Sequence, residues 1–157
     1  MGSRHLSRSI AVQTLYELDF HQDHAPSLDD VFARNCAEFG PELKDTEFAR
    51  RLVEKTLDHK TEADAIITRA APEWPLEKIN LVDRNILRLG LYKLIWGNHQ
   101  EVPERVAIDE AIELAKEFGG ESSGKFINGV LGTIYREMGK LDETNMQKTD
   151  TKDQNEA

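Results

Sequence analysis

The chain has 157 residues, of which 39% are hydrophobic and 31% are charged, and this composition is typical of a single soluble globular domain. The formal net charge of −9 argues against indiscriminate nucleic-acid binding, because an acidic field repels phosphates, but it allows a local basic patch. The most apolar run, residues 86–96, is too short to cross a membrane, and the N-terminus has no apolar signal-peptide core.

The numbers and spacing of cysteine and histidine argue against disulfide-stabilised and metal-binding proteins. Cys36 is the only cysteine, so a disulfide framework and a cysteine-based zinc site are excluded, and a reducing cytoplasm fits. The five histidines lack the spacing of metal ligands, and we expect neither a metal nor a cofactor. Glu110, Glu113 and Glu117 belong to an acidic run that is typical of a solvated helix face.

Apolar residues recur at helical spacing from the N-terminus onward, and no alternating strand pattern is present. Ser27 with Asp30, and Thr61 with Asp64, have the spacing of helix N-caps. The first three predicted helices cover about residues 4–21, 27–39 and 46–59. A fourth helix is predicted to begin at Thr61.

The second half of the chain contains the most apolar predicted helix, about residues 81–96, which we expect to be central and buried. Before it, Trp74 stands between two prolines and should pack as a hydrophobic plug. A sixth helix ends at Gly119-Gly120, and a seventh runs from about Ser122 to Met138.

Two further features belong to the seventh helix. Gly129 and Gly132 lie inside it, and close helix–helix approach is the simplest reason for them. After it, the polar tail should be disordered. The sequence therefore predicts a compact all-α domain of about seven helices over residues 1–139, followed by a tail over residues 140–157.

The first predicted helix has two different faces. Leu6, Ile10, Ala11, Leu15 and Leu18 fall on one side of a helical wheel. The opposite side combines cations, an amide, a hydroxyl group and an aromatic ring, in Arg4, His5, Arg8, Ser9, Val12, Gln13 and Tyr16. Single-stranded RNA is recognised by these groups, which contact phosphates, stack on bases and bond base edges. An ordinary solvated face has the same composition, so both interpretations stay open.

Residues 119–126 nearly match the phosphate-binding loop G-x-x-x-x-G-K-[ST]. Phe126 replaces the hydroxyl residue that would hold magnesium, and a helix rather than a strand precedes the segment, so nucleotide hydrolysis is disfavoured. A glycine-rich loop that leads into a helix, with Lys125 beside it, is still suited to one phosphate of a polymer.

Four segments together resemble the NusB family. The first helix has Arg4-His5, Arg8 and Ala11-Val12-Gln13 with Leu15-Tyr16, and the central helix reads VDRNILRLGLYKL from Val82. The third segment runs from Pro103 through VAIDEAIELAK, and the fourth reads SGKFINGVL from Ser123. The resemblance covers about residues 4–138.

The resemblance implies an all-helical fold of two subdomains and a protein without catalytic activity. It implies a transcription antitermination factor that binds boxA RNA together with NusE, a small-subunit ribosomal protein. Other Nus factors and RNA polymerase would be indirect partners, rRNA operons the main targets, and a homodimer an open alternative. By motif match, the RNA-binding residues would be Arg4, His5, Arg8, Gln13, Tyr16, Lys125, Phe126 and Asn128.

The matched motifs also imply a partner-binding residue and leave alternatives open. Asp83, expected on the outward edge of the central helix, would face NusE. One alternative is the RNA-binding helical domain of ribosomal RNA cytosine methyltransferases, although 157 residues leave no room for the cofactor-binding α/β fold of those enzymes. The other alternative is a helical scaffold that binds only proteins.

Overall fold

A computed structural model describes the backbone of residues 3–155 and the side chains of residues 3–139. Within that part, seven α-helices and three short helical turns are present and no strand, which confirms the all-α prediction. The elements in chain order are α1 (Ser3–His21), η1 (Gln22–His24), α2 (Leu28–Phe39), α3 (Glu47–Asp58), α4 (Lys60–Ala70), η2 (Leu76–Lys78), α5 (Leu81–Leu91), η3 (Tyr92–Trp96), α6 (Glu104–Gly119) and α7 (Glu121–Asn155).

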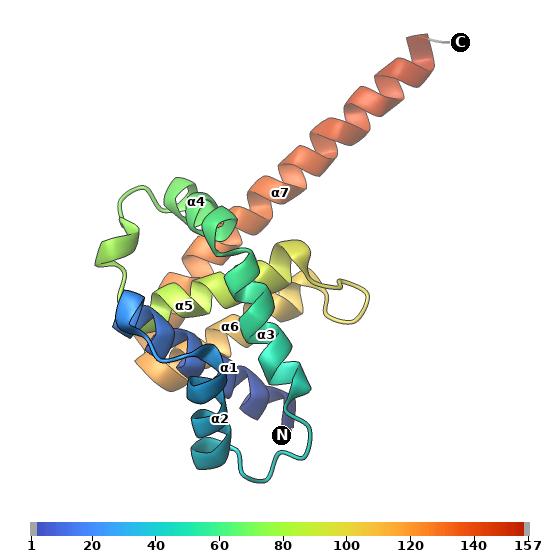
Figure 1. Cartoon of the computed structure of the whole chain (residues 1–157). Coiled ribbons are helices and arrows are strands. Elements are labelled where there is room, and N and C mark those ends of the chain that lie inside the picture. The colour runs from blue at the N-terminus through green and yellow to red at the C-terminus, as the bar shows by residue number, and fades with distance from the viewer. Residues whose placement is uncertain (1–2, 156–157) are drawn as a thin grey trace.

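Helix α5 lies at the centre of the fold, as its apolar sequence predicts (Figure 1). Ile86, Leu87 and Leu91 have no exposed surface, and α1, α3, α4, α6 and α7 all pack against this helix. The last turn of the segment, η3, is a π-helix that continues α5 without a break. Burial of the helix by five neighbours explains why most of its residues are apolar.

The core is divided into two clusters of buried side chains. The larger one surrounds α5 and collects residues from α1, α3, α4, α6 and α7. The smaller one consists of Ile10, Phe32 and Ala49, where α1, α2 and α3 meet. Helices α1 and α3 contribute to both clusters and so connect them.

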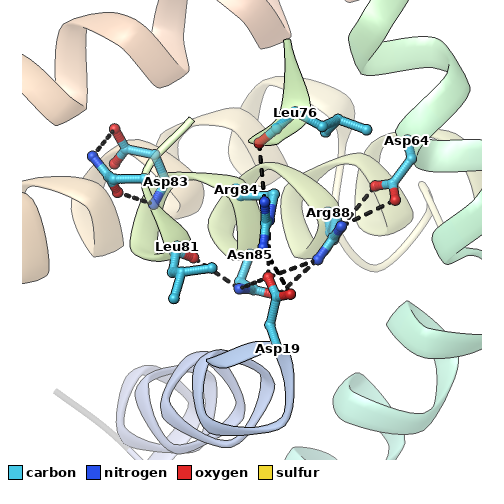
Figure 2. Close-up of polar contacts among 9 residues, drawn as sticks. Asp19, Asp64, Leu76, Leu81, Asp83, Arg84, Asn85 and Arg88 are labelled. Carbon is cyan, nitrogen blue, oxygen red and sulfur yellow. Dashed lines mark hydrogen bonds and ion pairs between the residues drawn. The ribbon is translucent and has the colours of Figure 1, made fainter. Parts of the chain in front are cut away.

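A network of buried polar side chains ties α1 and α4 to α5 (Figure 2). Asp19 of α1 accepts two hydrogen bonds from Arg84, at 2.8 and 2.9 Å, and one from Arg88 at 3.1 Å. Asn85 donates to the same carboxylate at 2.9 Å. Arg88 also donates to both carboxylate oxygens of Asp64 on α4, at 2.7 and 3.0 Å. Arg84 is therefore paired with a carboxylate from α1, and Arg88 is paired with carboxylates from α1 and α4.

The network also sets the ionisation of Asp19. Partial burial of this carboxyl group opposes its charged form, but the hydrogen bonds from Arg84 and Asn85 and the charge of Arg88 outweigh that effect. The pKa of Asp19 is consequently lower than its ordinary value. The ionised carboxylate is thus part of the folded structure.

Of the two predicted N-caps, one is confirmed and one is wrong. The Ser27 hydroxyl accepts from the Asp30 amide at 3.1 Å, as an N-cap does. Thr61, in contrast, lies inside α4, which begins at Lys60. The single residue between α3 and α4 is His59, whose ring stacks on Trp96 at 4.2 Å. This tertiary contact lies at the helix junction, where no side chain caps α4.

The prediction for Trp74 is also wrong, because 51% of this residue is exposed. Its ring makes only an edge contact with Phe126, with centroids 5.8 Å apart. Trp74 therefore lies at the surface, in the segment between α4 and η2.

Helix α7 continues well past the predicted end at Met138 (Figure 1). Its backbone is helical to Asn155 and projects from the rest of the fold. The side chains from residue 140 onward lie outside the described part of the chain. The division into a domain over residues 1–139 and a tail over residues 140–157 therefore stays a prediction.

Replacing Asp19 by Asn should lower the free energy of unfolding by roughly 3–5 kcal/mol near neutral pH, because two buried guanidinium groups would lose their shared counter-charge. The stabilisation by a carboxyl group of lowered folded-state pKa is complete above its unfolded-state pKa, and it is lost as the pH falls through the folded-state value. As the pH falls below about 4, the free energy of unfolding should therefore decrease less for the variant than for the wild-type chain. Urea unfolding at a series of pH values measures both effects.

The matched control is Asp29→Asn, which removes an exposed carboxylate paired with Arg50. We expect little change in stability for this variant, since exposed ion pairs contribute little. Equal stabilities of the two variants would contradict a structural role for the network.

Candidate nucleic-acid interface

Helix α1 is buried on more sides than its wheel predicts. Ser9 and Val12, expected on the polar face, are only 7% and 2% exposed. Arg8 and Gln13 are half-buried, and of the RNA-binding residues predicted on this helix only Arg4 is exposed. The polar face is consequently narrower than expected, because side chains of α6 and α3 lie against its two edges.

The glutamates of α6 cover one of these edges. His5 Nε2 lies 2.7 Å from a Glu117 oxygen, and His5 Nδ1 lies 3.6 Å from a Glu113 oxygen. Arg8 approaches Glu110 at 3.7 Å. Glu113 and Glu117 are exposed, as predicted for the acidic run of α6, whereas Glu110 is half-buried, and all three carboxylates face α1. They place negative charge beside the residues that would meet phosphate groups.

Glu110 is shared with a second cation, since Lys93 of η3 also forms an ion pair with it. Burial of the Lys93 amine favours its neutral form, and although Glu110 opposes this, the pKa of Lys93 is lowered. The positive charges of Arg8 and Arg4 act in the same direction as burial. The Glu110 carboxylate on α6 thus pairs with Arg8 of α1 and with Lys93 of η3.

The remaining predicted residues of α1 differ in their surroundings. The guanidinium carbon of Arg4 lies 3.9 Å from the centre of the Phe48 ring on α3, a cation–π contact. Tyr16 is half-buried and stacks on Phe20 with centroids 6.2 Å apart. Gln13 has a buried side-chain oxygen with no hydrogen-bond partner in the described part of the chain.

Phe20 was missed by the sequence interpretation. It is 59% exposed and continues the aromatic row of Tyr16 by one helical turn. The spacing of four residues between the two rings is the signal that would have identified it.

The second group of predicted residues lies near the start of α7. Lys125 and Asn128 are exposed, and Phe126 is half-buried against the core. Because α7 begins at Glu121, Gly124 and Lys125 are helical and do not form the expected glycine-rich loop. Among the glycines that the structure describes, only Gly120, with φ of 86°, has a backbone conformation that favours glycine.

Helix α6 connects the two groups. The contact between His5 and Glu117 places the first turn of α1 near the C-terminal end of α6, and α7 starts two residues after α6 ends. Among the described side chains, no hydrogen bond or ion pair joins the α1 group to Lys125 or Asn128. Their use as one surface stays a prediction.

Asp83 is not on an outward edge, because it is only 6% exposed. Its backbone amide donates to the Asn80 side chain at 2.8 Å, and the Asn80 amide donates back to one carboxylate oxygen at 3.1 Å. The other oxygen, Oδ1, is buried and has no hydrogen-bond partner among the described residues. The N-cap of α5 therefore accounts for the hydrogen bond to one oxygen of Asp83, while the burial of the other oxygen has no partner to account for it among the described residues.

Gly129 and Gly132 do not serve close helix packing, contrary to the prediction. An added Cβ at Gly129 would meet no atom within 4 Å, and one at Gly132 would meet only the Arg136 side chain, at 3.5 Å. Gly132 instead lines a groove of about 480 Å³ between α6 and α7, together with Arg105, Asp109, Asn128, Tyr135 and Arg136.

Metal and membrane sites are not indicated. In the described residues, no group of three or more His, Cys, Asp or Glu side chains is arranged to hold a metal ion. None of the helices searched there combines the length and the apolar character that a bilayer-spanning segment needs.

The fold and this surface define an all-helical protein with cations, amides and aromatic rings clustered near the first helix. Comparison with known families identifies the class further, because residues 5–136 match the NusB family. The chain belongs to the NusB family.

Curated relatives support this assignment. The chain is 42% identical over 133 residues to the transcription antitermination protein NusB of Chloroflexus aggregans, and the match covers 85% of this chain and 87% of that relative. It is 41% identical over 140 residues to the NusB protein of Roseiflexus castenholzii, covering 87% and 96%.

Solved structures share the fold. The NusB protein of T. maritima superposes with a TM-score of 0.74 at 33% identity, over 87% of this chain and 92% of that one. A structure of the antitermination factors NusB and NusE in complex with double-stranded RNA has a TM-score of 0.72 at 29% identity, over 85% and 96%.

Replacing Gly129 by Ala should raise the free energy of unfolding by about 1 kcal/mol, because the methyl group meets no neighbour and Ala favours the helix interior. The control is Gly90→Ala, whose Cβ would lie 3.1 Å from both Ala111 and Leu131. We expect no comparable gain there, because neighbouring atoms must move. Urea unfolding distinguishes the two. A destabilised Gly129→Ala variant would revive the close-packing explanation.

Proposed function

We propose that this chain is a transcription antitermination factor that binds boxA-type single-stranded RNA together with NusE and supports processive transcription, notably of ribosomal RNA operons. Membership of the NusB family and the names of the relatives support the first part. The solved complex of a related NusB with NusE and RNA supports a shared interface with both partners.

The observation that carries the proposal is the mixed surface of α1. Arg4 is exposed, and His5, Gln13 and Tyr16 are half-exposed. Guanidinium and imidazole groups contact phosphates, an amide bonds base edges, and a tyrosine ring stacks on a base. Lys125, Phe126 and Asn128 would extend this surface at the start of α7. None of these roles involves bond making, so we propose a binding protein and not an enzyme.

A basic partner protein follows from the charge distribution. The glutamates of α6 place negative charge beside His5 and Arg8, and the whole chain carries a net charge of −9. RNA affinity of the isolated chain should therefore be modest and salt-sensitive. NusE would add positive charge beside the RNA, and the buried Asp83 carboxylate, with one oxygen unpaired, would meet a partner cation after a small opening of the α6–α7 turn.

Further partners would contact this chain indirectly. Other Nus factors and RNA polymerase would be reached through the RNA and NusE, in the cytoplasm. A helical scaffold that binds only proteins is the competing function. It predicts NusE binding without any dependence on RNA.

Fluorescence anisotropy of a boxA-like single-stranded RNA, with and without NusE, tests the proposal. We expect selective binding over a scrambled RNA at the same salt concentration, and tighter binding with NusE. Tyr16→Ala should weaken binding roughly 5- to 150-fold, because loss of one stacked base costs about 1–3 kcal/mol. The control is Phe39→Ala, which removes an exposed ring from α2. Unchanged affinity of Tyr16→Ala would exclude stacking, and no binding with NusE present would favour the scaffold.

Neutralising the α6 acids should have the opposite effect. In the double variant Glu113→Gln and Glu117→Gln, His5 loses its two acidic neighbours, so we expect severalfold tighter RNA binding at low salt. The control double variant Glu42→Gln and Glu62→Gln changes the net charge equally at exposed residues of other segments. An equal gain in both would show that only the net charge matters.

A further inference from the structure

A groove of about 450 Å³ opens between α1, α3 and η3. Of the residues that line it, only Arg4 is among the RNA-binding residues proposed above. Its volume lies within the range of ligand-binding sites. Among its lining residues are four cations and one carboxylate, which are Arg4, Arg51, Lys55, Lys93 and Glu101. Such a cationic lining is unexpected on a chain whose net charge is −9.

Three of the four cations are available for a ligand. Lys93 is bound to Glu110, but no ion pair with an acidic side chain is found for Arg4, Arg51 or Lys55 in the described part of the chain. Arg51 and Lys55 are exposed and lie one helical turn apart on α3. Several other arginines of the protein are paired with acids, as Arg34, Arg50 and Arg84 are.

Aromatic rings line the same groove. Phe48 holds the Arg4 guanidinium over its face, and Tyr92 presents a phenol near Arg51. Burial raises the pKa of Tyr92, and the positive charge of Arg51 partly opposes that rise, as expected for two neighbouring side chains. Cations beside flat rings are the combination that binds single-stranded nucleic acid.

The groove wall is built by an unusual turn. The π-helix Tyr92–Trp96 ends at Gly97, where an added Cβ would lie 2.4 Å from the Lys93 carbonyl oxygen. The loop that follows is held by His99, whose ring nitrogen Nε2 lies 2.6 Å from the Leu94 carbonyl oxygen.

We propose that this groove binds the sugar–phosphate backbone of the RNA that passes over α1, with Arg51 and Lys55 contacting phosphates and Tyr92 or Phe48 contacting a sugar or base. Arg4 connects the two regions, because it belongs to the α1 surface and also lines the groove. The inference rests on the proposed RNA binding and adds a path for nucleotides beyond the α1 surface.

The test is RNA binding by the double variant Arg51→Gln and Lys55→Gln, measured by anisotropy with NusE over a range of salt concentrations. We expect roughly ten-fold weaker binding and a salt dependence reduced by about 0.7 for each phosphate that the variant no longer neutralises. The control double variant Arg69→Gln and Lys78→Gln removes the same charge at exposed residues that do not line the groove. Both substituted pairs are exposed, and thermal unfolding should show that each variant folds.

RNA length supplies a second readout. Extending a short boxA-like RNA by several nucleotides at one end should strengthen binding to the wild-type and control chains but not to the groove variant. An equal gain in all three chains, or equal weakening of both double variants, would overturn the groove path. If Tyr16→Ala weakens binding and the groove variant does not, the groove proposal fails and the proposed function stands. If the wild-type chain binds no RNA with NusE present, both fail.

Discussion

Two guanidinium groups of α5 lie in the interior, and their need for counter-charge constrains the rest of the structure. Arg88 is only 7% exposed in its side chain and binds carboxylates from both α1 and α4. Desolvated charges are tolerated only when they are paired in good geometry, so α1 and α4 must lie where Asp19 and Asp64 can reach α5. The network thereby fixes the orientation of α1, the helix that carries most of the proposed RNA-binding residues.

The orientation of α1 has consequences at both of its edges. On one side, the glutamates of α6 place negative charge beside His5 and Arg8. On the other side, Arg4 packs on Phe48 and lines the cationic groove with α3. The first edge would weaken RNA binding by the isolated chain, and the second would add to it. Such a balance suits a protein whose RNA affinity depends on a partner.

Sequence patterns identified the helices, the central position of α5 and the Ser27 cap, because these depend on local periodicity and short-range hydrogen bonds. Thr61, Trp74 and Gly129 were misjudged for a common reason. The stacking of His59 on Trp96, the exposure of the Trp74 loop and the open surface at Gly129 all depend on segments distant in sequence. Similarly, a role for Arg51 and Lys55 could be proposed only when Tyr92 was found beside them.

The amino-acid sequence alone was enough to establish the all-helical class, the buried central helix and, through four motifs, membership of the NusB family. The periodicity of apolar residues shows which face of a helix is buried, but it does not show which helix covers it. The folded structure was needed to establish that His5 meets Glu117, 112 residues away, that Asp83 is buried, and that cations of α1, α3 and η3 share one groove. These features arise from packing between distant segments, whose charges interact only after the chain has folded.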